Sequence, residues 1–388
     1  MHRFFQKDTR MAPEKAATAI GITHAKDPEL NRYFRLAIKT KASDIHLKVG
    51  QPPKLRLYGS LKNTTGEVMT EERMEELVFA LFSPVQKDFF LEHGTIDFAH
   101  EVDKSDRFRV NVFRQRGAIS LAARRVNSTI PSFESVNLPP VLSRISDSPD
   151  GLVLIVGPTG CGKTTTIAAM IDHINANRSC HIVTIEDPIE YLYRDRKALV
   201  SQREIGIDVL DFNEALIYMM RQDPDVVLVG EMRDMKTVTA ALRAAETGHL
   251  VFGTLHSANS AQAIHRMLDL FPQDERDLTR QTLALSVRAI ASQRLIPCIK
   301  EGIERVPAME ILLGNPSVKK LIAEEREADL PAVIKACTKE GMQDFTEDLA
   351  RLVLEGYVDP KEAFKVAPNK EELKMALKGI KTSSAGIL

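Results

Sequence analysis

The sequence is poor in the features that mark a membrane, secreted or zinc-stabilised protein. It has no tryptophan and only four cysteines among 388 residues, and none of the four lies in a C-x-x-C pair. We therefore expect reduced thiols rather than a zinc module or a disulfide framework. The apolar runs are too short to span a bilayer, and Lys7, Asp8 and Arg10 interrupt the short apolar start at Phe4 and Phe5. These absences predict a cytoplasmic protein with no segment inserted in the membrane.

The chain also lacks an excess of charge of either sign. Its formal net charge is -1, with 44% hydrophobic and 27% charged residues, which is typical of a soluble globular protein. Such a balance gives no overall attraction to nucleic acid. A nucleic-acid translocase should carry basic loops interleaved with aromatic residues. Nucleic acid is therefore not expected as a partner.

The chain is longer than a typical single domain, and its pattern changes along its length. Residues 1–27 are polar and mixed, which predicts a flexible arm. Residues 28–130 combine an amphipathic helix, with Leu30, Phe34 and Ile38 at helical spacing, with short alternating strands. This mixture predicts a small α+β amino domain.

Residues 131–150 are rich in Pro, Ser and Asn, and we interpret them as the interdomain linker. Over residues 151–314, short apolar runs alternate with helical stretches, and residues 315–388 are helical only. Near-continuous apolar strands between helices predict an α/β domain whose parallel sheet is covered on both faces. The expected strands are 152–156, 182–185, 226–229, 250–254 and 311–313.

A phosphate-binding loop follows the first of these strands. Residues 157–164 match G-x-x-x-x-G-K-[ST], and a helix-forming run begins directly after them. The glycines let backbone N–H groups turn toward phosphate oxygens, and the helix N-terminus adds partial positive charge. In such loops the lysine reaches the β- and γ-phosphates and the hydroxyl of the last residue holds Mg²⁺. The sequence predicts ATP and Mg²⁺ as ligands, with the nucleotide held by Gly157, Pro158, Thr159, Gly160, Cys161, Gly162, Lys163, Thr164 and Thr165.

Carboxylates follow two further strands. Glu186 ends the strand over 182–185, and Glu231 stands just beyond the strand over 226–229. In an open α/β sheet, ligands bind outside the carboxyl ends of the strands, so both acids should face the phosphates. Hydrolysis needs one acid to orient or deprotonate the attacking water and another for the magnesium shell. Glu190 and Asp234, by contrast, are expected to be exposed charges or helix caps.

A histidine and a cysteine complete the predicted site. His256 follows the strand over 250–254, where it could hydrogen-bond the γ-phosphate and report its loss. Cys161 lies in the phosphate loop at a helix N-terminus, where thiol pKa values tend to fall. Two interpretations of Cys161 stay open: an activated thiol that nucleotide protects from alkylation, or an inert small side chain.

Two arginines of the amino domain are predicted to face each other. Arg116-Gly117 is expected to form a two-residue hairpin turn, because glycine supplies the positive φ that such turns need. Counting back from Gln115 opposite Ala118 places Arg109 directly opposite Arg124. Two facing cations repel, so the arrangement favours convergence on a phosphate. We expect Arg109 and Arg124 to act as arginine fingers on ATP bound to a neighbouring subunit; the alternative is two solvated arginines on an exposed face.

Taken together, these motifs resemble those of the PilT class of pilus retraction motors, within the type II/type IV secretion ATPase family. The resemblance covers most of the chain and is carried by the phosphate loop and five further segments: 185–191, 225–232, 253–256, 43–47 and 107–111. It implies a PAS-like amino domain joined to a RecA-like ATPase domain, assembled as a homo-hexamer. By the same resemblance, Glu186 activates water, Glu231 is the Walker B acid that contacts magnesium, and His256 senses the γ-phosphate. Gly230 stands where an aspartate often precedes the glutamate, so the division of roles between Glu186 and Glu231 stays open.

The family resemblance also implies a biological role. Its members dock on an inner-membrane platform protein and drive movement of pilin subunits, here retraction and twitching motility. Extension and secretion ATPases usually carry a further amino-terminal domain and a four-cysteine zinc insertion, which this sequence lacks. Residues 123–126 are similar to accessory PilU-like members, and residues 315–322 depart from the usual retraction pattern. A second retraction ATPase as partner, an extension motor and a nucleotide-gated subunit with little turnover therefore stay open.

Overall fold

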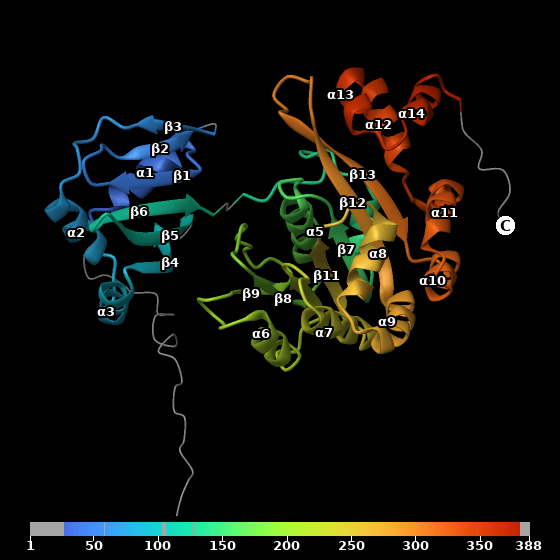
Figure 1. Cartoon of the computed structure of the whole chain (residues 1–388), viewed down its shortest axis with the longest axis horizontal. Coiled ribbons are helices and arrows are strands. Elements are labelled where there is room, and N and C mark those ends of the chain that lie inside the picture. The colour runs from blue at the N-terminus through green and yellow to red at the C-terminus, as the bar shows by residue number, and fades with distance from the viewer. Residues whose placement is uncertain (1–26, 58, 103–105, 127–128, 381–388) are drawn as a thin grey trace, which may run out of the picture. The chain divides into compact units, whose positions relative to one another are not determined.

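The computed structural model describes residues 27–57, 59–102, 106–126 and 129–380 (Figure 1). They form two compact units: the residues up to 126 together with 206–208, and residues 129–205 together with 209–380. All but the last residue of the arm expected over 1–27 lies outside the described ranges. Each unit has its own sheet and its own hydrophobic core. The chain thus combines an α/β unit with a mostly parallel sheet and an amino-terminal unit with an antiparallel sheet.

The first unit is a six-stranded antiparallel sheet with the order β3-β2-β1-β6-β5-β4, packed with three helices. Its longest strand, β5, alternates as expected, since Phe108, Val110 and Val112 are fully buried while the residues between them are partly exposed. Local caps set the helix ends: Ser83 and Gln86 form a capping box, and Gly94 ends that helix with φ 73°. The elements are α1 (Asn31–Thr40), β1 (Asp44–Lys48), β2 (Lys54–Leu57), β3 (Ser60–Asn63), α2 (Glu71–Phe79), α3 (Pro84–His93), β4 (Thr95–Val102), β5 (Asp106–Gln115) and β6 (Ala118–Arg125).

The β5–β6 hairpin confirms the register predicted from its turn. Gln115 pairs with Ala118, and Arg109 pairs with Arg124. Both turn residues have positive φ, 52° at Arg116 and 83° at Gly117. A turn of this kind matches the twist of the flanking strands, which explains why counting from it reaches the correct pair.

The second unit is a seven-stranded sheet with the order β13-β12-β7-β11-β10-β8-β9, in which only β13 runs antiparallel to its neighbour. The expected central strands are confirmed, whereas β9 and β12 were not predicted and the strand expected at 311–313 is the end of the antiparallel β13. The strands are β7 (Gly151–Val156), β8 (His181–Glu186), β9 (Leu199–Glu204), β10 (Val226–Val229), β11 (Leu250–Leu255), β12 (Val287–Pro297) and β13 (Arg305–Leu313).

Helices cover both faces of this sheet, which explains why its strands are apolar without alternation. Along β7, Leu152 and Leu154 point into one core, and Val153 and Ile155 point into the other. Both faces of β7 are therefore buried, and all of its positions are apolar or glycine. The helices in chain order are α4 (Val141–Ser146), α5 (Lys163–Asn177), α6 (Phe212–Met219), α7 (Met235–Glu246), α8 (Ser260–Asp269) and α9 (Gln273–Ser286).

The segment expected as a linker, 131–150, is partly folded against the second unit. Leu138, Leu142 and Ile145 are buried in the same core as α5, and α4 forms within the segment. The helical spacing of these apolar residues could have predicted a buried helix, but the Pro- and Ser-rich composition favoured a linker. Residues 315–380 are helical as predicted, with α10 (Pro316–Ala323), α11 (Leu330–Ala336), α12 (Phe345–Leu354), α13 (Pro360–Val366) and α14 (Lys370–Leu377). Short 3₁₀ turns lie between α10 and α11 and between α11 and α12.

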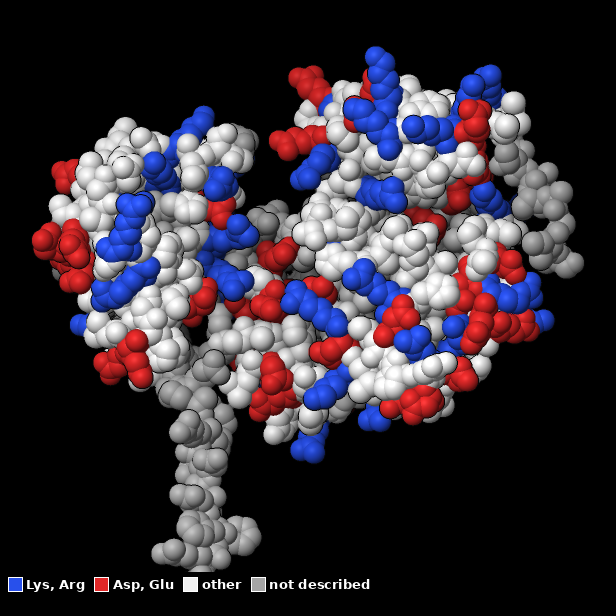
Figure 2. Space-filling view, viewed as in Figure 1, with Lys and Arg blue, Asp and Glu red and all other residues white. Residues whose placement is uncertain are grey.

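Two surface properties bear on partners. Among the described residues, no helix is both long and apolar enough to cross a bilayer. On the face seen in Figure 2, basic and acidic side chains are interspersed over each unit, in line with the net charge of -1.

Candidate functional site

The phosphate loop is held in a shape that only glycine allows at its first position. Gly157 has φ 151°, and a Cβ there would lie 2.4 Å from the carbonyl oxygen of Gln293. Gln293, on β12, donates to the Cys161 carbonyl at 2.7 Å and accepts from the Thr166 hydroxyl at 2.7 Å. The loop is therefore hydrogen-bonded to β12, and α5 begins directly after it. Lys163 begins α5, and its Nζ donates back to the Gly157 carbonyl at 2.9 Å.

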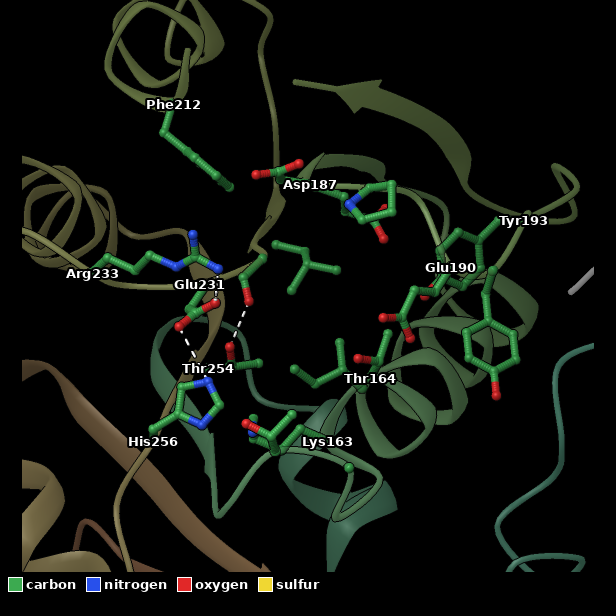
Figure 3. A pocket seen from close by; sticks show the side chains of 18 residues that line it. Lys163, Thr164, Asp187, Glu190, Tyr193, Phe212, Glu231, Arg233, Thr254 and His256 are labelled. Carbon is green, nitrogen blue, oxygen red and sulfur yellow. Dashed lines mark hydrogen bonds and ion pairs between the residues drawn. The ribbon is translucent and has the colours of Figure 1, made fainter. Parts of the chain in front are cut away.

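The loop borders a cavity of 210 Å³ at the carboxyl ends of the parallel strands (Figure 3). Because β7, β11, β10 and β8 are neighbours, the residues that follow them meet at one edge of the sheet. The cavity brings together the predicted site residues Thr159, Gly160, Lys163, Thr164, Glu186, Glu231 and His256. Glu190 lines it as well, whereas Asp234 caps α7 by accepting from the Thr237 N–H, as expected.

The other predicted loop residues do not line this cavity. Gly162 and Thr165 line a second cavity of 320 Å³ on the far side of the loop, together with Thr166, Leu295 and Leu138. Gly157, Pro158 and Cys161 line neither of these two cavities. Arg109 and Arg124 belong to the first unit, so the structure does not bring them into this site.

Glu186 is the buried acid of the cavity. Its side chain is 6% exposed, and this burial raises its pKa to about 7. The Thr184 hydroxyl donates to Oε1 at 2.6 Å and the Gln202 amide donates to the same oxygen at 3.2 Å, and both interactions lower the pKa. A carboxyl that titrates near neutrality in a cavity is suited to accept a proton from water.

Glu231 is the more exposed acid and has two side-chain partners. Arg233 donates to Oε2 at 2.6 Å, and Nε2 of His256 lies 3.2 Å from Oε1, as the dashed lines in Figure 3 mark. The hydrogen bond from Arg233 holds the pKa of Glu231 below its usual value. Glu231 is therefore a carboxylate at neutral pH and suits a cation, whereas Glu186 suits a proton.

The pKa of Cys161 differs from the expectation. Its side chain is 3% exposed, and burial raises the pKa of the thiol although Lys163 acts in the opposite direction. The expectation of a lowered pKa at the helix N-terminus is therefore wrong, because the thiol is buried and does not line the cavity. The burial and the raised pKa favour the inert small side chain of the two interpretations.

Sequence reasoning missed four residues that shape the site: Thr184, Gln202, Arg233 and Gln293. Thr184 could have been found, because it stands two residues before Glu186 and shares its face of β8. Gln202 and Gln293 lie on β9 and β12, the two strands that were not predicted. Arg233 was passed over as part of the acidic segment.

Comparisons with known proteins agree with this site. Residues 132–347 match the family described as Type II/IV secretion system protein. The type IV pilus retraction ATPase PilT of Pseudomonas aeruginosa is 40% identical over 335 residues, which are 86% of this chain and 97% of that protein. The type IV pilus ATPase PilU of the same species is 35% identical over 350 residues, which are 90% of this chain and 91% of that protein.

A solved structure agrees with the sequence comparisons. The crystal structure of the pilus retraction motor PilT with bound ADP is similar with a TM-score of 0.82 at 40% identity, over 90% of this chain and 99% of that one. The resemblance drawn from the motifs, and the nucleotide-binding ATPase fold it implies, are confirmed. The chain belongs to the type II/IV secretion system protein family and is a PilT- and PilU-like ATPase of that family.

Proposed function

We propose that this chain is the subunit of a ring-shaped motor that hydrolyses ATP to drive retraction of a type IV pilus. The observation that carries the proposal is a single cavity that joins the phosphate-loop Lys163 to a buried acid of pKa about 7 and to the Glu231–His256 pair. Glu186 takes the proton of the attacking water, Lys163 neutralises charge on the β- and γ-phosphates, and His256 contacts the γ-phosphate. The relatives named retraction ATPase and PilU support retraction as the work performed.

The residues present fit magnesium as the partner of ATP. Magnesium in nucleotide sites usually takes one or two carboxylates or hydroxyls from the protein and completes its shell with phosphate oxygens and water. Thr164 and Glu231, both at this cavity, would hold it in that way, and the ion would neutralise charge on the phosphates. Glu231 would then exchange its contacts with Arg233 and His256 for the cation.

Arg109 and Arg124 act as arginine fingers across a subunit boundary in this proposal. Their facing positions on β5 and β6 support it, and a homo-hexamer is the assembly that the family suggests. Rings that mix Lys163→Ala subunits with Arg124→Ala subunits test it, because some junctions combine one intact phosphate loop with one intact finger. Hydrolysis that recovers on mixing supports action between subunits, whereas mixed rings that stay inactive contradict it.

Deletion of the gene tests the direction of movement. We expect the cells to accumulate surface pili and to lose twitching motility, because retraction stops while extension continues. Loss of pili would instead indicate an extension motor. Normal pili with motility impaired only under load would favour an accessory role beside a second retraction ATPase. An inner-membrane platform protein is the expected docking partner of the ring on its cytoplasmic side.

A further inference from the structure

Arg124 is held in an unusual way for an exposed arginine. Its side chain is 76% exposed, yet its Nε donates to Oδ1 of Asp44 at 2.9 Å. In the described part of the chain, its Nη1 and Nη2 atoms make no hydrogen bond. The guanidinium is thus fixed at its inner edge and presents both terminal nitrogens outward.

Asp44, the residue that fixes it, is itself rigidly placed. It lies on β1 between β2 and β6, directly opposite Arg56 on one side and Arg124 on the other. Its side chain is only 10% exposed, and Oδ2 accepts from the Ser43 hydroxyl at 2.8 Å. Burial raises the pKa of Asp44, but the hydrogen bonds from Ser43 and Arg124 outweigh this effect and keep the pKa below its usual value. This buried, ionised carboxylate fixes Arg124 through Oδ1, while its Oδ2 also lies 3.5 Å from Nε of Arg56.

The adjacent arginine shows what a purely structural pair looks like in this sheet. Arg125 donates both Nε, at 3.1 Å, and Nη2, at 2.6 Å, to Oδ1 of Asp106. Its side chain is only 23% exposed. Arg125 therefore uses two of its nitrogens to bind its own partner, whereas both Nη atoms of Arg124 stay available for another ligand.

We propose that Asp44 is a positioning residue: it holds Arg124 by Nε so that the two Nη groups meet a phosphate of ATP on a neighbouring subunit. This inference rests on the proposed finger role of Arg124. A planar guanidinium binds phosphate with two parallel N–H bonds, and such a grip needs its plane and direction to be set beforehand. Asp44 supplies that orientation before ATP arrives, so less side-chain freedom is lost when the phosphate binds.

Three substitutions distinguish a positioning role of Asp44 from a role of its negative charge alone. Asp44→Asn keeps an oxygen acceptor for Nε, so turnover should stay within about tenfold of the wild type. Asp44→Glu keeps the charge but moves the acceptor by one methylene, and kcat should fall about 10²-fold, as expected for a misplacement of about 1 Å. ATP affinity should hold, because the phosphate loop lies in the other unit. The matched control Asp106→Ala, which frees Arg125, should leave kcat within about twofold.

The decisive measurement is the double-mutant cycle of Asp44→Glu and Arg124→Ala, with ring formation and melting temperature recorded for each variant. Asp44→Glu should cost nothing further once Arg124 is gone. The inference is overturned if Asp44→Glu lowers kcat by the same factor with Arg124 present and with Arg124→Ala. It is also overturned if Asp44→Glu turns over normally while Asp44→Asn does not. If Asp44→Glu turns over at the wild-type rate while Arg124→Ala is inactive, the positioning role of Asp44 is wrong but the finger role of Arg124 stands. Arg124→Ala at the wild-type rate instead overturns the finger proposal on which it rests.

Discussion

Lys163 is a residue at which catalysis should separate from folding. Among the residues that the structure describes, its Nζ donates hydrogen bonds only to the loop carbonyls of Gly157 and Pro158, and each such bond contributes about 1 kcal/mol. The loop itself is tied down by Gln293. We therefore expect Lys163→Ala to abolish ATP hydrolysis while the melting temperature stays near that of the wild type.

A steady-state ATPase assay with a thermal melt of the same preparation checks this prediction. Lys236→Ala is the matched control, because it removes an exposed lysine from α7 outside the cavity. Most of the wild-type turnover in Lys163→Ala would mean that the nucleotide is bound elsewhere.

The pH dependence of the motor should follow Glu186. Its carboxyl has a pKa of about 7, so the fraction of the base form, and with it kcat/KM, rises as pH increases through neutrality. Thr184→Val removes the hydroxyl that donates to the ionised form at 2.6 Å and leaves the buried volume nearly unchanged. The pKa should then rise further, and the acid limb of the profile should move to higher pH with activity recovering in the alkaline range.

The profiles of kcat/KM against pH for the two proteins decide this prediction. Thr239→Val serves as the control, since its hydroxyl bonds only the Met235 carbonyl of α7. If the limb of Thr184→Val coincides with that of the wild type, Glu186 is not the group that titrates.

At the scale of elements, β12 supports the phosphate loop. Gln293 is 1% exposed and satisfies both the Cys161 carbonyl and the Thr166 hydroxyl. Gln293→Leu would leave these two groups buried without partners, at a cost of about 1–3 kcal/mol each. We expect a lower melting temperature and weaker ATP binding, because the loop loses its tie to the sheet.

Calorimetric ATP titration and a thermal melt measure both effects. Gln281→Leu is the control, because Gln281 is exposed on α9 and makes one long bond of 3.3 Å. Unchanged affinity in Gln293→Leu would show that α5 holds the loop without help from β12.

At the scale of the whole molecule, attachment to the membrane should depend on a protein. Among the described residues, no helix could cross a bilayer, and the charges on the visible face are mixed in sign. We therefore expect the chain to sediment with membranes in cells that have the platform protein and to remain in the supernatant in cells that lack it. Sedimentation with membranes in both strains would point to a lipid-binding surface instead.

The sequence by itself determined the features that depend on neighbours along the chain. The phosphate loop, the strand ends that carry Glu186 and Glu231, and the pairing of Arg109 with Arg124 were all predicted, and the structure has them at those positions. The physical reason is that backbone geometry sets each of these over a few residues: a loop between strand and helix, a strand that ends, or a two-residue turn that fixes its register.

Tertiary structure alone decided what depends on burial and on residues far apart in sequence. The pKa of Glu186 is raised by burial and tempered by Gln202, 16 residues away, and the pKa of Cys161 rises instead of falling for the same reason of burial. Arg124 is fixed by Asp44, 80 residues earlier. The free energy of an ionised group depends on the solvent and charges that packing places around it, and no local pattern carries that information.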